Sequence, residues 1–243
     1  MNILLDFTLV GFSIVMLWKG ADWLVDSAAE IAHTLKVSDL IIGLTVVAFG
    51  TSAPEFAVTI SAAITKQTDI SIGNVIGSNI FNLGFILGGT AMIRPIITNK
   101  KMFNRDGLFL LIVTALIFFL FFGFNGWTAD DTFSKHEGMI LFSLLIGYIT
   151  FLFIKKDPPE KINPNSANYK SYIYFFIGLI SIVYGGHLMV NHASNLARYY
   201  GISDWVIAVT IVAAGTSAPE FATSIAAAFK GRHGIAIGNL IGS

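Results

Sequence analysis

The sequence GTSAPEF occurs twice, at 50–56 and at 215–221. Both copies lie within long apolar stretches, and each places a proline and a glutamate where a continuous membrane helix tolerates neither. Proline has no N–H group and its ring clashes with the carbonyl four residues earlier, so Pro54 and Pro219 each predict a break in a helix. The glycine that opens each motif is expected to let the chain leave helical angles at the break.

The composition is that of a polytopic membrane protein. Of 243 residues, 54% are hydrophobic and only 12% are charged, against roughly 25% charged residues in soluble domains. The net charge of zero gives no indication of a nucleic-acid partner. The absence of cysteine excludes disulfides and thiolate metal sites.

Apolar segments of membrane-spanning length recur along the chain. Seven are expected, near 3–22, 40–64, 70–96, 107–125, 137–154, 172–192 and 205–229. An eighth begins near 235 and stops at Ser243. The predicted class is therefore an all-α, multi-pass membrane protein.

The two motifs belong to a longer internal repeat. When the chain is shifted by the spacing of the motifs, 43–78 aligns with 208–243 without a gap, and 21 of 36 positions are identical. The copies lie in the second and seventh expected spans, so the same sequence must cross the membrane in opposite directions. Inverted repeats with interrupted helices at the midplane are typical of alternating-access transporters. We predict inverted five-span repeats, the second of which breaks off within span 8.

This repeat also gives the expected domain boundaries. The first repeat covers 1–154 with its GTSAPE motif at 50–55, and the second covers 171–243 with its motif at 215–220. Between them, 155–170 is rich in proline, asparagine and charge and is predicted to be a flexible linker.

Basic residues predict the orientation. With spans that alternate in direction, one side of the membrane collects twelve lysines and arginines and the other only three, namely Lys66, Lys135 and Arg198. The expected location is a cell membrane, either plasma or inner. The positive-inside rule then places the N-terminus outside the cell and the 155–170 loop on the cytoplasmic side.

Oxygen-bearing side chains surround both predicted breaks. Glu55 and Glu220 lie one residue after the prolines, and a glutamate at membrane depth normally faces the protein interior with a partner. Hydroxyl groups flank them at Thr51, Ser52, Thr216 and Ser217. Because Ca²⁺ prefers about six to eight oxygen ligands, this set indicates a site for hard cations. Neither motif contains the cysteine or histidine that zinc or copper would favour.

The segment that follows each motif adds a polar stripe. Asn74, Ser78 and Asn82 recur at every fourth residue, and Asn239 and Ser243 repeat the first two positions. The stripe could line a site or could form hydrogen bonds between membrane helices. Similarly, Ser52-x-x-Glu55 also fits a capping box, in which the glutamate only completes the start of a helix.

Other functional classes have less support from the residues. A serine protease needs a base close to its nucleophile, and no histidine lies near either GTS. An aspartyl protease would bring two carboxylates to one water, but no motif of such an enzyme is present. A channel needs a ring of like oxygens, whereas two inverted copies supply a pair. We therefore expect a transporter and not an enzyme.

GTSAPE followed by GNVIGSNIFN (73–82), repeated as GTSAPE and GNLIGS (238–243), resembles the repeats of the cation/Ca²⁺ exchanger superfamily. The similarity is to prokaryotic sodium/calcium exchangers and to the potassium-dependent branch, and it covers essentially the whole chain. It implies ten spans in two inverted repeats. It further implies an antiporter that carries Na⁺ inward and Ca²⁺ outward, with no organic cofactor, and whose partners are inorganic cations and the lipid bilayer.

The resemblance also implies a set of ligands. Glu55 and Glu220 would hold Ca²⁺ together with the carbonyls of Thr51 and Thr216. One Na⁺ site would be lined by Ser52, Ser78 and the carbonyl of Ala48, and its mirror by Ser217, Ser243 and the carbonyl of Ala213, with Asn82 between them. Coupling to H⁺ or K⁺ instead of Na⁺, or an inactive ion-binding fragment of such a transporter, are the alternatives.

Overall fold

The computed structural model describes residues 3–98, 100–122, 134–155 and 166–243, and all regular structure within these ranges is helical. The chain forms two compact units. The first combines Met1–Ile96 with Asp157–Ser243, and the second is Ile97–Lys156. Both GTSAPE motifs lie in the first unit.

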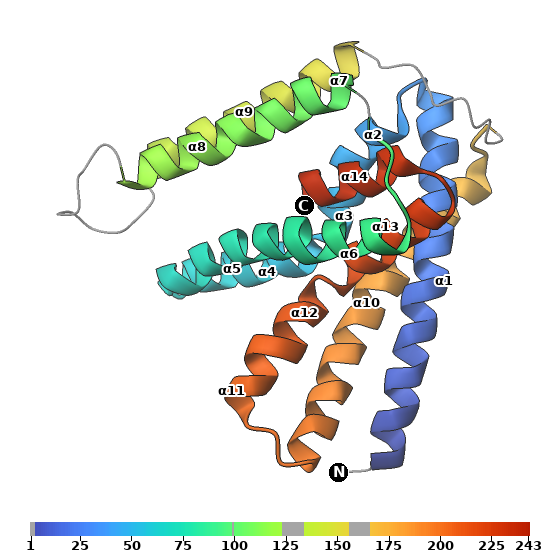
Figure 1. Ribbon diagram of the computed structural model, residues 1–243, viewed down its shortest axis with the longest axis vertical. Coiled ribbons are helices and arrows are strands. Elements are labelled where there is room, and N and C mark those ends of the chain that lie inside the picture. Colours follow the sequence, from blue (N-terminus) through green and yellow to red (C-terminus); the bar gives the residue numbers. More distant parts are fainter. Residues whose placement is uncertain (1–2, 99, 123–133, 156–165) are drawn as a thin grey trace. The chain divides into compact units, whose positions relative to one another are not determined.

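The first unit contains two matching series of helices (Figure 1). The earlier series is α1 (Ile3–Leu35), α2 (Asp39–Ile42), the π-helix η1 (Gly43–Val47), α3 (Ala48–Thr51), α4 (Ala53–Ile64), α5 (Thr68–Ile80), the π-helix η2 (Phe81–Leu87) and α6 (Gly88–Ile93). The later series is α10 (Tyr169–Tyr199), α11 (Asp204–Ile207), the π-helix η5 (Ala208–Val212), α12 (Ala213–Thr216), α13 (Ala218–Phe229) and α14 (His233–Gly242).

The central helices of the two series match residue for residue. The spacing between Gly50 and Gly215 carries α2, η1, α3 and α4 onto α11, η5, α12 and α13 with identical bounds. Even the turns match, because Lys36 and Gly201, and likewise Lys66 and Gly231, have positive φ at matching positions. The duplication is therefore preserved in the backbone as well as in the sequence.

The expected spans correspond to helices of sufficient length. Five helices among the described residues are long and apolar enough to cross a membrane: Ile3–Leu35, Ile70–Ile93, Phe103–Leu120, Lys135–Lys155 and Tyr169–Tyr199. Two bent pairs raise the number to seven, Asp39–Thr51 with Ala53–Ile64 and Asp204–Thr216 with Ala218–Phe229. These seven match the seven segments predicted from hydropathy.

The first span is longer than predicted, because α1 continues past residue 22 to Leu35. Asp22, Asp26 and Glu30 recur at every fourth residue beyond the expected end of the span. In the structure these acids have partners elsewhere in the unit: Lys230 pairs with both aspartates, and Ser171 donates a hydrogen bond to Glu30. Partners that are distant in sequence thus allow the helix to continue through charged positions.

The helices α1 and α10 lie side by side and antiparallel (Figure 1). At one end, His192 Nδ1 lies 2.7 Å from the buried carboxylate of Asp6. At the other end, Ser171 Oγ lies 2.5 Å from Glu30 Oε2. Because α10 is the repeat counterpart of α1, the two repeats run in opposite directions, as predicted.

The second unit is a helical hairpin with a polar contact. It contains α7 (Lys100–Met102), the π-helix η3 (Phe103–Gly107), α8 (Leu108–Phe122) and α9 (Lys135–Lys155). The rings of Phe109 and Tyr148 stack at 3.8 Å between α8 and α9. Buried Asp106 is bound by both Arg105 and the Tyr148 hydroxyl.

The predicted linker at 155–170 lies largely outside the described residues, which omit 156–165. Its two ends are helical, since Lys155 closes α9 and Tyr169 opens α10. Asn168 fixes that start with a capping box: its side chain accepts from the backbone of Lys170 at 2.8 Å, and Ser171 Oγ accepts from the Asn168 N–H at 3.1 Å.

Candidate cation site

Both GTSAPE motifs break their helices, as the prolines predict. The axis bends by 55° between α3 and α4 and by 46° between α12 and α13. The residues at the breaks are Ser52, with φ −82° and ψ 10°, and Ser217, with φ −89° and ψ 11°. Each proline occupies the first turn of the next helix, where its missing N–H removes no hydrogen bond.

The glycines of the motifs have a different role from the predicted one. Gly50 and Gly215 lie within α3 and α12 and do not leave helical angles. A Cβ atom at Gly50 would lie 2.6 Å from Leu179 Cδ1, and one at Gly215 would lie 2.1 Å from Val190 Cγ2. Both glycines therefore permit α10 to pack closely against the broken helices, and the break itself falls two residues later.

The two motifs exchange hydrogen bonds across the repeats. Ser52 Oγ donates to Glu220 Oε1 at 2.7 Å, and Ser217 Oγ donates to Glu55 Oε1 at 3.2 Å. The glutamates are buried, with 8% of Glu55 and 1% of Glu220 exposed. This crossed arrangement brings the two carboxylates together inside the first unit, although they are far apart in sequence.

Several oxygens at this centre are buried without a hydrogen-bond partner. They are Oε2 of Glu55, Oε2 of Glu220 and Oδ1 of Asn82. Asn82 lies on η2, which packs against α13 and α14. A buried carboxylate oxygen without a partner is costly, and a cation with oxygen ligands removes that cost.

Each glutamate is also fixed through its backbone by an asparagine. Asn74 Nδ2 donates to the carbonyl of Glu55 at 3.0 Å and to Thr59 Oγ1 at 2.9 Å. In the second repeat, Asn239 Nδ2 donates to the carbonyl of Glu220 at 3.3 Å and to Ser224 Oγ at 3.1 Å. The first residue of the predicted polar stripe therefore connects two helices and orients the start of the helix that carries the glutamate.

The two hydroxyls that complete these contacts were not among the predicted site residues. Thr59 and Ser224 occupy matching positions of the repeat, each fifteen residues before its asparagine. The signal was a hydroxyl-bearing side chain at the same place in both copies, threonine in one and serine in the other. It was difficult to recognise because serine and threonine in helices commonly bond to a carbonyl of their own helix, as Thr45 does here.

Four predicted ligands form hydrogen bonds within their own helices. Ser78 Oγ donates to the carbonyl of Val75 at 3.1 Å, and Ser243 Oγ to the carbonyl of Asn239 at 2.5 Å. The carbonyls of Ala48 and Ala213 accept from Thr51 Oγ1 at 3.2 Å and from Thr216 Oγ1 at 3.1 Å. Their assignment to Na⁺ sites stays a prediction.

The two threonines of the motifs have different surroundings. Thr51 is fully buried, and its hydroxyl also donates to Asn239 Oδ1 of the other repeat at 2.9 Å. Thr216 is partly exposed and lines a cavity. The repeats are thus alike in sequence and in backbone but differ in how closely the rest of the unit covers them.

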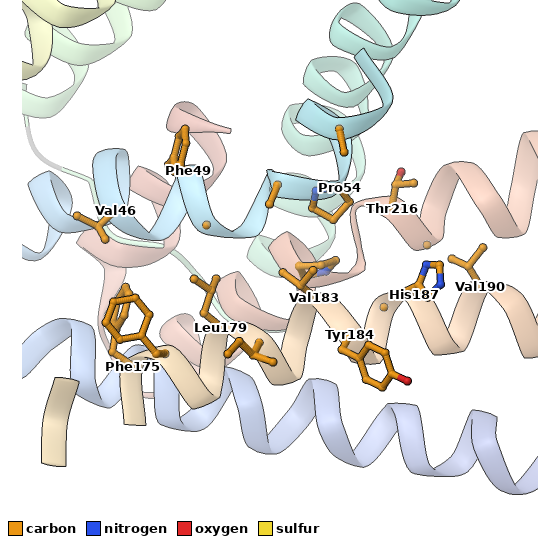
Figure 2. Close-up of a pocket in the computed structure, with 18 of the residues that line it drawn as sticks. Val46, Phe49, Pro54, Phe175, Leu179, Val183, Tyr184, His187, Val190 and Thr216 are labelled. Carbon is orange, nitrogen blue, oxygen red and sulfur yellow. The ribbon is translucent and has the colours of Figure 1, made fainter. Parts of the chain in front are cut away.

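Two cavities flank the site and are related by the repeat. The larger, about 930 Å³, lies between α3–α4, α10 and α12, with Phe49, Pro54, Leu179 and Thr216 among its lining residues (Figure 2). The smaller, about 530 Å³, lies between α1 and α13. Ile14 and Ala222 of the smaller cavity match Leu179 and Ala57 of the larger one.

The described residues contain no group of three or more histidine, cysteine, aspartate or glutamate side chains that could hold a metal ion. Around Glu55 and Glu220, the described residues offer hydroxyl, amide and carbonyl oxygens as further ligands for a cation. Such a neutral oxygen set suits Ca²⁺ and Na⁺ better than zinc or copper.

The family model described as sodium/calcium exchanger protein matches residues 5–154 and 170–243. The chain belongs to the sodium/calcium exchanger family. The gap in the match, 155–169, lies within the segment predicted to be a linker. Membership agrees with the all-helical, multi-pass architecture and with a transport protein.

Two similar proteins match nearly the whole chain. The sodium/calcium exchanger MaX1 of Methanosarcina acetivorans is 34% identical over 280 residues, which cover 99% of this chain and 79% of the relative. The membrane protein MJ0091 of Methanocaldococcus jannaschii is 38% identical over 234 residues, covering 95% of this chain and 74% of the relative.

A solved structure of the family has the same fold. The sodium-calcium exchanger NCX_Mj, soaked with 10 mM Na⁺ and zero Ca²⁺, has a TM-score of 0.85 and 35% identity to this chain. The match covers 100% of this chain and 79% of NCX_Mj.

Proposed function

We propose that this chain is a secondary active antiporter that carries Na⁺ into the cell and Ca²⁺ out of it by alternating access. The observation that supports this most is the crossed pair of hydrogen bonds between Ser52 and Glu220 and between Ser217 and Glu55. It joins two carboxylates from inverted repeats and leaves one oxygen of each buried without a partner. The family membership and the names of the relatives support the same ions.

The proposed ligands are the residues that the resemblance implies. Ca²⁺ would lie between Glu55 and Glu220, with the carbonyls of Thr51 and Thr216 completing its shell. Na⁺ would occupy one site at Ser52, Ser78 and the Ala48 carbonyl, a mirrored site at Ser217, Ser243 and the Ala213 carbonyl, and contacts to Asn82 between them.

Exchange follows from competition for the two carboxylates. Two like charges in a site of low dielectric repel one another, and a divalent cation relieves the repulsion. Several Na⁺ ions can do the same by using the flanking hydroxyls. The empty site should rarely change its facing, because an uncompensated buried charge is expensive. If more charge enters with Na⁺ than leaves with Ca²⁺, each net charge gains about 2.3 kcal/mol per 100 mV.

In the proposed orientation, the N-terminus lies outside the cell and the 155–170 loop lies on the cytoplasmic side of the cell membrane. The excess of lysine and arginine on one side supports it. The antiparallel packing of α1 and α10 is consistent with it, because their matching ends must then lie on opposite sides.

Uptake of ⁴⁵Ca²⁺ into vesicles driven by an opposing Na⁺ gradient tests the function. Glu55→Gln and Glu220→Gln are each expected to abolish Na⁺-driven flux, since each removes one of the two charges that bind the cation. Glu137→Gln is a matched control, because Glu137 is a partly exposed carboxylate in the second unit that accepts a hydrogen bond from the Ser134 N–H. Retained flux in either site variant would remove that carboxylate from its role.

The same vesicles distinguish the coupling ion. A Na⁺ gradient is expected to drive uptake with no K⁺ gradient and no pH gradient present. If uptake required a pH gradient or K⁺, Na⁺ would not be the sole driving ion, and H⁺ or K⁺ would have to be included in the exchange. Absence of flux under every gradient would contradict transport by this chain.

A further inference from the structure

Ion pairs fasten the two repeats together on one side of the site. Lys230 Nζ, in the turn between α13 and α14, lies 3.1 Å from Asp22 Oδ1 and 2.8 Å from Asp26 Oδ2, both on α1. It also donates to the carbonyl of Asp22 at 3.0 Å. Two residues later, Arg232 Nη1 lies 3.3 Å from Asp39 Oδ2 at the start of α2. The turn Lys230–Arg232, called the basic turn below, thus binds two helices of the first repeat.

The matching turn of the first repeat carries neither cation of the basic turn. The repeat relates Lys230 and Arg232 to Thr65 and Gln67, between α4 and α5. Thr65 Oγ1 donates to the carbonyl of Ser61 at 2.8 Å, within its own helix. Lys66 is the basic residue of this turn, but it occupies the position with φ 59° that matches Gly231.

The acids on α1 also lack acidic counterparts on α10. Asp22 corresponds to His187 and Asp26 to Asn191. These two residues are exposed, and their side chains lie 2.9 Å from one another within α10. Three ion pairs therefore join the two repeats on one side. On the mirrored side, His187 and Asn191 bond inside α10, and Asp204, the counterpart of Asp39, pairs with Arg198 of its own repeat at 2.7 Å.

The two cavities beside the site also differ in volume, and the smaller one lies on the side of the ion pairs. Asp22 and Lys230 themselves line the smaller cavity of about 530 Å³ between α1 and α13. His187 lines the larger cavity of about 930 Å³ on the mirrored side. In addition, α13 packs against α1, whereas its counterpart α4 has much less contact with α10. The cavity on the side with the three ion pairs is thus the smaller one, and the cavity on the mirrored side is the larger one.

We propose that the basic turn is a one-sided latch. By holding α13 and α14 to α1 and α2, it stabilises the state in which the cation site opens only toward the opposite side. The inference rests on the proposed function, because a latch of this kind acts on alternating access. In the proposed orientation the latch is cytoplasmic, so the exchanger at rest faces outward.

The absence of cysteine makes accessibility a clean measurement. Ala57→Cys and Ala222→Cys place single thiols at matching positions in the larger and the smaller cavity. Their rates of reaction with a membrane-impermeant maleimide are measured from each face of sealed vesicles. These rates report which cavity is open, with no need for ion transport.

Lys230→Met is expected to raise labelling of Ala222→Cys from the cytoplasmic face and to lower labelling of Ala57→Cys from the other face. Each change should be about two- to fivefold, because partly exposed ion pairs contribute modestly. Asp26→Asn removes one pair at an exposed position and should act in the same direction if Lys230→Met does not fold. Lys170→Met, at an exposed lysine on the same side, is the control and should change neither rate.

The latch can also be moved. Thr65→Lys combined with His187→Asp and Asn191→Asp places the pairs on the mirrored side and should lower labelling of Ala57→Cys. Unchanged labelling in both Lys230→Met and Asp26→Asn, or a rise in both cavities, would overturn the latch. A failure of Na⁺-driven uptake would instead contradict the proposed function and would leave the labelling result to decide on the latch.

Discussion

At the scale of single residues, the serine of each motif serves the other repeat. The spacing Ser52-x-x-Glu55 also fitted a capping box, but neither Ser52 nor Ser217 caps its own helix through its side chain. Their hydroxyls donate to Glu220 and Glu55 across the site instead. Sequence spacing could not distinguish these arrangements, because the deciding partner lies more than 160 residues away.

Removing one of these hydroxyls should weaken Na⁺ binding. Ser52→Ala and Ser217→Ala each delete a donor to a charged carboxylate and a proposed Na⁺ ligand. Hydrogen bonds to charged groups contribute about 1.5–3 kcal/mol, so the Na⁺ concentration for half-maximal Ca²⁺ flux should rise about tenfold. The Na⁺ dependence of vesicle uptake measures it. Ser13→Ala is the control, since Ser13 is buried but donates only to Val10 of its own helix; an equal change there would contradict the assignment.

The asparagines should differ in their contributions to stability. Asn239 is fully buried and bonds Glu220, Ser224 and Thr51, whereas Asn74 is partly exposed and makes only the first two kinds of contact. Asn74→Leu should cost about 1–3 kcal/mol and Asn239→Leu more, because it leaves additional buried groups unpaired. Thermal unfolding in detergent compares them. Asn79→Leu, which changes an amide bonded to its own helix, should be nearly neutral.

At the scale of elements, the sequence predicted the breaks and the inverted order but not the helical details. Proline chemistry is local, so the bends at both motifs could be predicted. The π-helices η1 and η5, and the length of α1, depend on contacts with distant segments and could not. The packing of α14 against α2 and η1 is another such case, because its counterpart α5 has the same glycines without those neighbours.

This difference predicts unequal effects of the same substitution. A Cβ atom at Gly238 would lie 2.6 Å from the carbonyl oxygen of Leu40 and 2.7 Å from the backbone nitrogen of Leu44, which cannot move independently. Gly238→Ala should therefore destabilise the protein by about 1–3 kcal/mol. At the matching Gly73 nothing lies within 4 Å, so Gly73→Ala should be neutral or stabilising by up to about 1 kcal/mol. Thermal unfolding of both variants tests this, and equal losses would contradict the asymmetric packing.

At the scale of the whole molecule, two copies of one sequence adopt the same backbone but not the same surroundings. The repeat alone predicted that Glu55 and Glu220 meet, and the structure brings them together. It could not predict that Thr51 is buried while Thr216 lines a cavity, because the motif is identical at both places. The copies differ at positions outside the motif, such as Lys230 and Thr65, and the proposed latch depends on that difference.

Inversion of the repeats makes a direct prediction about exposure to the two sides of the membrane. Leu35 at the end of α1 and Tyr200 just after α10 are matching positions, and 46% and 66% of their surfaces are exposed. Because α1 and α10 are antiparallel, Tyr200→Cys should react with an impermeant maleimide in intact cells, and Leu35→Cys only after permeabilisation. Reaction of both in intact cells would contradict the inverted repeat. The reverse pattern would retain the inversion but place the N-terminus in the cytoplasm, and with it the latch on the outside.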